Sequence, residues 1–171
     1  MLDQAIIRTG IKFGVSCALA GFLVVLVLYF AGLNPYGQLI MWGWIFIPVA
    51  VFWGLSYFKK FNDQQLSFMK ALKVGFSIAF YSALCSAMLL YVFSIVAGFE
   101  PIQRHITEMK ALMDASREAA LQSKVMTKEA FDQTYAQLDK TTPYMLAFDD
   151  FIKKFFVGFL SAVVGAVFFR K

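Results

Sequence analysis

The sequence has few of the residues from which catalytic and metal sites are built. It contains one histidine and two cysteines among its 171 residues. It has no CxxC or HExxH pair, no GxSxG turn and no glycine-rich phosphate loop. His105 follows Arg104 on what we expect to be a charged helix face. Cys17 and Cys85 lie in apolar runs, where we expect small apolar side chains rather than a disulfide or metal ligands. We therefore predict no catalytic residue, no metal site and no cofactor, and we expect that the protein is not an enzyme.

Charge is absent from three long stretches. No Asp, Glu, Lys or Arg occurs in residues 13–58, 74–99 or 155–169. A helix of about 20 apolar residues crosses the hydrocarbon core of a bilayer. The first stretch is too long for one crossing, and Gly and Pro in "GLNPYGQ" (32–38) divide it. We predict an all-α integral membrane protein with four transmembrane helices, near residues 11–32, 38–58, 73–98 and 149–169.

The fourth span has a short uncharged core and must use a turn of "FDDFIKK" (148–154). Asp149 and Lys153, like Asp150 and Lys154, are spaced for an ion pair along a helix, which lowers the cost of that turn. These four residues are a candidate site for a lipid headgroup at the outer leaflet, and anchoring of the helix at the interface is the competing explanation. We expect no carboxylate in the interior of a span.

The positions of lysine and arginine predict the orientation. They gather at both termini and between the second and third spans, so these parts are expected in the cytoplasm and residues 99–148 outside it, in the periplasm of a Gram-negative cell. Lys59, Lys60, Lys70 and Lys73 would then attract anionic lipid by about 1 kcal/mol each. The net charge of +5 needs no nucleic-acid partner. Residues 59–73 are expected to form a short interfacial helix capped near Ser67.

The predicted spans and their orientation divide the chain into five parts. They are a first transmembrane hairpin (1–60), a cytoplasmic interfacial loop (61–72), a third span (73–98), an extracytoplasmic helical insert (99–148) and a fourth span (149–171).

Three pairs of similar segments occur in the same order along the chain. "KFGVSCA" (12–18) matches "KVGFSIA" (73–79), "AGLNP" (31–35) matches "AGFEP" (97–101), and "WGLSYFKK" (53–60) matches "VGAVFFRK" (164–171). The pairs favour a duplicated helical hairpin, the second copy of which has an insertion in its outer loop. Convergence on similar residues at helix entries and exits is the alternative.

Small residues recur every four positions on three of the spans. Lipid is as apolar as the helices, so helix association relies on the close backbone approach that such residues permit. We expect these faces to pack the bundle, or to bind another membrane protein or a second copy of the chain. The second span is bulkier, and we expect a kink at Pro48. The predicted packing residues are Gly10, Gly14, Ala18, Gly75, Ala79, Ala83, Ala87, Gly158, Ala162 and Ala166.

Residues 101–141 have the pattern of two short amphipathic helices. Thr127 is a candidate N-cap for the second of them, and "TTP" (141–143) supplies another cap before the fourth span. Helices this short need tertiary contacts to be stable. We expect the hairpin to fold on its own bundle or to dock on a partner.

The stretch "LSFMKALKVGFSIAF" (66–80) follows a hydrophobic hairpin that ends in lysines. Ser67, Phe68, Ala71, Lys73 and Gly75 fit the pattern SFxxAxKxG. Over roughly residues 5–171 the chain resembles the family of small bacterial membrane proteins known as domain of unknown function 4199. The resemblance implies four spans, a charged helical insert and the inner membrane of Gram-negative bacteria. It implies no known activity and no catalytic residues.

Three functions are compatible with this pattern. The first is a non-catalytic scaffold or accessory subunit of the inner membrane that packs with an envelope protein or complex. The alternative is a small oligomeric transporter or lipid-handling protein. An intramembrane enzyme would require catalytic groups that the sequence lacks. The partners expected from the sequence are therefore the lipid bilayer and another membrane protein or a homo-oligomer.

Overall fold

The computed structural model describes residues 3–122 and 127–170, and within these residues the chain is helical and has no strand. Four helical stretches are long and apolar enough to cross a membrane. The predicted all-α membrane fold with four spans is therefore confirmed. In chain order the elements are α1 (Gln4–Phe30), the 3-10 helix η1 (Gln38–Ile45), α2 (Phe46–Phe61), α3 (Phe68–Val96), α4 (Glu100–Gln122), α5 (Lys128–Leu138) and α6 (Pro143–Phe169).

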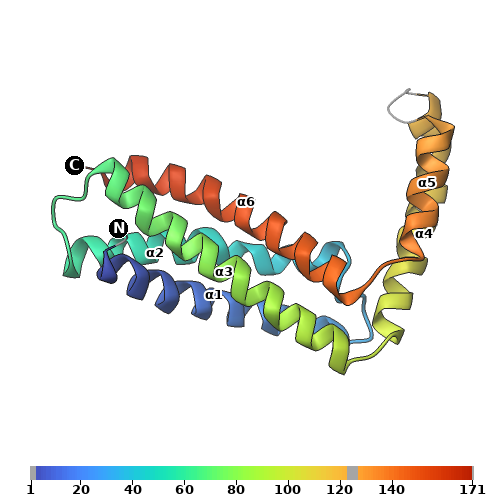
Figure 1. Cartoon of the computed structure of the whole chain (residues 1–171), viewed down its shortest axis with the longest axis horizontal. Coiled ribbons are helices and arrows are strands. Elements are labelled where there is room, and N and C mark those ends of the chain that lie inside the picture. Colours follow the sequence, from blue (N-terminus) through green and yellow to red (C-terminus); the bar gives the residue numbers. More distant parts are fainter. Residues whose placement is uncertain (1–2, 123–126, 171) are drawn as a thin grey trace.

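Helices α1, α2, α3 and α6 form an elongated bundle (Figure 1). Helix α3 packs most extensively against α6 and α1, and α2 packs against all three. Both ends of the chain lie at one end of the bundle, and α4 and α5 stand side by side at the other, which we call the hairpin end (Figure 1). Which end faces the cytoplasm stays a prediction.

Glycines with the same left-handed backbone conformation follow the first and third spans. Gly32 and Gly98 follow the last residues of α1 and α3 with φ of 71° and 79°, a left-handed conformation that glycine adopts without steric cost. After α1, the Leu33 N–H donates to the Leu28 carbonyl at 2.9 Å and closes the helix end. The "AG" of both "AGLNP" and "AGFEP" thus has the same local role, although duplication of the whole hairpin stays a prediction.

Small residues let the backbones of α3 and α6 approach closely. A Cβ added to Gly158 would lie 2.6 Å from the Ala79 Cβ, and one added to Gly75 would lie 2.7 Å from the Ala162 Cβ. The contact is reciprocal, with a glycine of each helix against an alanine of the other. On the opposite side of α3, a Cβ on Gly14 would lie 2.9 Å from the Ile78 carbonyl oxygen. Helix α3 is therefore held by close backbone contact on two sides.

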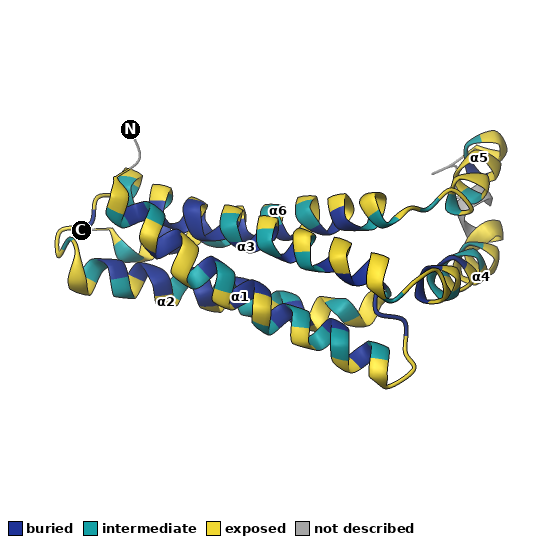
Figure 2. Cartoon of the chain, turned by 60° about the horizontal axis from the view of Figure 1, so that its bottom comes forward, coloured by how far each residue is buried: buried dark blue, intermediate teal, exposed yellow. Residues whose placement is uncertain are grey.

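The outer surface of the bundle is apolar. Leu23, Val27, Val96 and Phe156 are all more than half exposed, and Phe168 is 74% exposed. Figure 2 shows exposed residues along the outside of the four spans and buried ones on their inner faces. A soluble protein rarely exposes an apolar surface this large, whereas hydrocarbon chains would cover it in a bilayer.

The second span begins as a 3-10 helix and not as an α-helix. Eight residues, Gln38–Ile45, have this winding before α2 starts at Phe46. The expected distortion therefore lies just before Pro48. Proline has no N–H for the Trp44 carbonyl, and its ring clashes with that carbonyl in an α-helix. Gly43 also lies against α1, where a Cβ would be 3.3 Å from the Gly21 carbonyl oxygen.

Several expected boundaries differ from the structure, including the start of α1 at Gln4 rather than near residue 11. A helix begins after Ser67, as expected, but it is not a separate interfacial helix within 59–73. It is the start of α3, whose Ala71 and Val74 are buried in the bundle. Helix α6 starts at Pro143, so its first turns precede the expected span at 149–169. Thr142 caps it by accepting from the Met145 N–H, and Thr127 caps α5 by accepting from the Ala130 N–H. Both predicted caps are confirmed.

The close contact between α3 and α6 predicts opposite effects for two glycine substitutions. Alanine favours a helix by about 1 kcal/mol over glycine. Gly158→Ala should nevertheless destabilise the protein by about 1–3 kcal/mol, because the new methyl group overlaps Ala79. Gly21→Ala is the control. It should stabilise the protein slightly through the higher helix propensity of alanine, since its Cβ would meet only the Gly43 carbonyl oxygen, at 3.5 Å. Thermal unfolding in detergent measures both, and equal midpoints would contradict the packing argument.

Candidate functional site

The charged turn of α6 is divided between the surface and the interior. Asp149 and Lys153 form an ion pair at 2.5 Å with both side chains more than half exposed. Asp150 and Lys154 form a second pair at 2.9 Å, and their side chains are only 5% and 6% exposed. A shift of one residue along a helix turns the side chain by about 100°, which places the second pair inside the bundle.

Ser86 of α3 completes the buried pair. Its hydroxyl donates to Asp150 Oδ2 at 3.0 Å and accepts a hydrogen bond from the Lys154 ammonium. Ser86 lies ten residues before Val96, the last residue of α3, and so roughly 15 Å from the hairpin end of that helix. Isolated charges at such depth are costly, and pairing and hydrogen bonding lower that cost. We call Ser86, Asp150 and Lys154 the buried triad.

The expectation of no carboxylate within a span is therefore wrong for Asp150. The sequence contains a signal for its position. Asp150, Lys154, Gly158, Ala162 and Ala166 are spaced four apart, and all five are buried. Extending the small-residue face of α6 by two turns toward its start would have predicted both buried charges.

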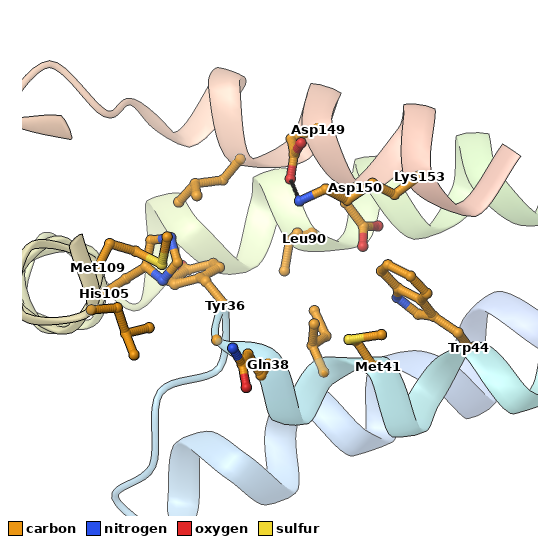
Figure 3. A pocket seen from close by; sticks show the side chains of 14 residues that line it. Tyr36, Gln38, Met41, Trp44, Leu90, His105, Met109, Asp149, Asp150 and Lys153 are labelled. Atoms are coloured by element: carbon orange, nitrogen blue, oxygen red, sulfur yellow. Dashed lines mark ion pairs between the residues drawn. The ribbon is translucent and has the colours of Figure 1, made fainter. Parts of the chain in front are cut away.

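A pocket of about 260 Å³ lies beside the buried triad at the hairpin end of the bundle. We call it the outer pocket. Figure 3 shows its wall of η1 side chains facing those of α6, with α4 at one side. Asp150 lines the pocket and so joins it to the triad. The other lining residues are Tyr36, Gly37, Gln38, Ile40, Met41, Trp44, Leu90, His105, Met109, Leu112, Leu146, Asp149 and Lys153.

Asn34 fastens α4 to the loop after α1. Its side chain is buried, and its Nδ2 donates to Glu108 Oε2 at 2.7 Å and lies 3.1 Å from His105 Nδ1. Its Oδ1 accepts from the Tyr36 N–H at 2.9 Å. The Arg104 guanidinium also donates to the Gly32 carbonyl. No local sequence pattern predicts these contacts with α4, since the partners are more than 70 residues apart.

The Asn34 contacts decide the state of the only histidine. Because Oδ1 takes the Tyr36 N–H, Nδ2 can only donate, and His105 Nδ1 must accept. The imidazole is then neutral with its proton on Nε2. Burial lowers the pKa of His105 below its ordinary value, opposed in part by the Glu108 carboxylate. His105 thus lies half-buried in the first turns of α4, which we call the root of the hairpin. The sequence-based expectation that it lies on a charged helix face is wrong.

The remaining predicted residues lie where the bundle is packed or at its opposite end. Lys59 donates to the Phe169 carbonyl at 3.1 Å, and Lys70 pairs with Asp63 at 2.9 Å. Lys60 and Lys73 are exposed, and their attraction to anionic lipid stays a prediction. Of the ten predicted packing residues, all are buried except Ala87, which is partly exposed.

These features define the class of the protein. Four apolar spans with a lipid-facing surface, closed by small-residue contacts, make it a multi-pass membrane protein. The family model described as "Protein of unknown function (DUF4199)" matches residues 12–171, and the chain belongs to that family. The resemblance inferred from the SFxxAxKxG pattern is thereby confirmed. No curated protein and no solved structure matches the chain.

The buried triad predicts that two adjacent lysines differ in their effect on stability. Lys154→Met should lower the free energy of unfolding by about 3–5 kcal/mol, because it leaves the Asp150 carboxylate buried without its partner. The control Lys153→Met removes an exposed partner and should change little. Adding Asp150→Leu to Lys154→Met should restore much of the loss. Denaturant titration in detergent micelles measures all three, and equal losses for the two lysine variants would contradict the buried pairing.

The Asn34 contacts predict the titration of His105, which can be followed directly because the chain has one histidine. We expect a pKa below about 6.5 and the Nε2–H form at neutral pH. The docked hairpin holds the neutral ring, so the contribution of His105 to docking is complete above about pH 6.5 and is lost as the pH falls through the lowered pKa. NMR of histidine-labelled protein reads both properties.

Two variants should shift the pKa of His105 in opposite directions in the same NMR titration. Glu108→Gln should lower the pKa of His105 further, because the carboxylate favours the protonated ring. Asn34→Asp should raise it by placing a carboxylate beside Nδ1. A proton on Nδ1 at neutral pH would refute the assigned hydrogen bond.

Proposed function

We propose that the protein is a non-catalytic scaffold or accessory subunit of the inner membrane that presents the α4–α5 hairpin to an envelope protein. The proposal places both termini in the cytoplasm and the hairpin in the periplasm, as the lysine and arginine positions predict. The observation that carries it is the way the hairpin is held. It is fixed at its root and exposed over much of the rest.

The root of the hairpin is well packed. Ile102 and Ile106 are buried against Val25, Leu90 and Phe93 of the bundle. Together with the Asn34 and Arg104 hydrogen bonds, these contacts fix the direction in which α4 leaves the membrane end of the bundle. A fixed direction lowers the entropy cost of binding a partner at a set distance from the bilayer.

Beyond its root the hairpin is stabilised by contacts between its own two helices. Lys110 forms an ion pair with Asp139 at 2.7 Å, and the Tyr135 hydroxyl donates to Asp114 at 3.2 Å. Phe131 is the buried anchor of α5. The outward faces of α4 and α5 are mostly exposed (Figure 2). These faces are the surface that we assign to a partner.

The alternative is a small transporter or lipid-handling protein. The observation that favours it is the outer pocket, with Asp150 of the buried triad in its wall. Charges within a membrane bundle often serve ions or substrates. An accessory role stays the main proposal, because a pocket that only binds a ligand is compatible with it and does not require transport.

The test is purification from the native membrane in mild detergent, followed by mass spectrometry of copurifying proteins. We expect a stoichiometric protein partner with the parent chain. Ala111→Arg combined with Ala136→Arg adds two bulky charges to exposed positions of α4 and α5 and should release that partner. The matched control is Gln64→Arg combined with Gln65→Arg, at exposed positions between α2 and α3.

Two results would contradict the proposal. One is a partner that is retained by the hairpin variant and lost by the control. The other is a chain that copurifies only with copies of itself, which would favour the transporter or lipid-handling alternative.

A further inference from the structure

We propose that the outer pocket binds the headgroup of a zwitterionic phospholipid, with the phosphate at Lys153 and Trp44 and the ammonium at Asp149. This inference does not rest on the accessory role proposed above. It follows from the charge, the hydrogen-bonding groups, the size and the position of the pocket.

The charges of the side chains that line the outer pocket, counted together with Lys154 as the partner of Asp150, sum to zero. Asp149 and Lys153 are an ion pair at its edge. The charge of Asp150 is cancelled by Lys154 within the buried triad. His105 is neutral, since its Nδ1 accepts from Asn34. A singly charged ligand of either sign thus finds no net countercharge, whereas a ligand that carries one charge of each sign is matched.

The surface ion pair leaves groups of both kinds for such a ligand. Lys153 has three ammonium hydrogens, of which the contact with Asp149 Oδ2 uses one. The Asp149 carboxylate accepts through Oδ2 in that contact and keeps Oδ1 for a second donor. A phosphate beside Lys153 and an ammonium beside Asp149 would extend the ion pair into an alternating set of four charges.

Trp44 supplies a hydrogen-bond donor for which the described residues offer no acceptor. Its Nε1 is buried and has no hydrogen-bond partner among the described residues. The indole lines the outer pocket, and Figure 3 shows it on the η1 side of the pocket, below Asp150. A buried N–H without an acceptor costs about 1–3 kcal/mol, so such groups are nearly always paired. A phosphate oxygen is an acceptor of the right kind.

The size and position of the pocket select a lipid over a free solute. Its 260 Å³ is just below the usual range for ligand pockets, roughly 300–1,000 Å³, and fits a headgroup rather than a whole lipid. Ile40, Leu90 and Leu146 line it, and Met41 at its edge is 54% exposed. The pocket lies at the hairpin end of four spans, where the headgroups of one leaflet would lie, so acyl chains could follow the apolar surface of the bundle.

The experiment is native mass spectrometry of the full chain released from nanodiscs that contain equal amounts of phosphatidylethanolamine and phosphatidylglycerol with the same acyl chains. We expect the parent chain to retain phosphatidylethanolamine preferentially. Asp149→Asn gives the pocket a net positive charge and should reverse the preference toward phosphatidylglycerol. Asp132→Asn removes the same charge from an exposed position of α5 and is the matched control.

A second pair of variants tests the tryptophan. Trp44→Phe keeps an aromatic ring but removes the donor, and should lower retained phosphatidylethanolamine about tenfold, as expected for the loss of one hydrogen bond to a charged group. Trp53→Phe is the control, since Trp53 is 68% exposed on α2. If Trp44→Phe does not yield folded protein, Asp149→Asn at its exposed position decides the question alone.

Three results would overturn the proposal. The first is equal retention of the two lipids by the parent chain. The second is an unchanged lipid ratio in Asp149→Asn, or equal losses in the two tryptophan variants. The third is displacement of the lipid by water-soluble phosphoethanolamine at comparable concentration, which would make a soluble phosphate ester the ligand and exclude the membrane as its source.

Discussion

The close approach of α3 and α6 is the constraint on which the rest of the structure depends. In a bilayer the hydrophobic effect does not drive helices together, so the reciprocal contact of Gly75 with Ala162 and of Gly158 with Ala79 has to do so. The same contact sets the rotation of α6 about its axis, and this rotation turns Asp150 and Lys154 inward. It also brings the two backbones near enough for a side chain as short as that of Ser86 to reach both charges. Packing and polar chemistry therefore have one cause here.

The second span has the opposite character, and the outer pocket results from the difference. Where α6 meets α3 the residues are small, but η1 carries Trp44, Met41 and Ile40 toward the same region. Bulky side chains on a 3-10 helix do not fit closely against α6, so a cavity stays between them at the hairpin end. The loop before η1 then supplies Asn34, which bonds His105 and Glu108 of α4 at one side of that cavity, and Tyr36, whose ring packs against that of His105. The hairpin root and the pocket share a wall.

Local patterns in the sequence predicted the local features well. The four spans, the small-residue faces and the caps at Thr127 and Thr142 all follow from residues within one or two helical turns of each other. The features that were missed depend on contacts across the fold. His105 looked like a surface residue, because Asn34, which buries it, belongs to another element. The split of the charged turn required the rotation of α6, and a pattern of period four running through Asp150 and Lys154 contained that information in the sequence itself. The winding of η1 depends on Pro48 and Gly43 together.

The 3-10 winding of η1 also makes the second span longer than an α-helix with the same number of residues would be. A 3-10 helix rises about 2.0 Å per residue and an α-helix about 1.5 Å, so the eight residues Gln38–Ile45 extend roughly 4 Å further than an α-helix of the same length. Rewinding this segment as α-helix would shorten it by that amount and draw Tyr36 and Asn34 toward the middle of the bilayer. Since Asn34 is bonded to α4, the hairpin would be pulled with them. The length of one short segment thus sets the height of the hairpin above the membrane.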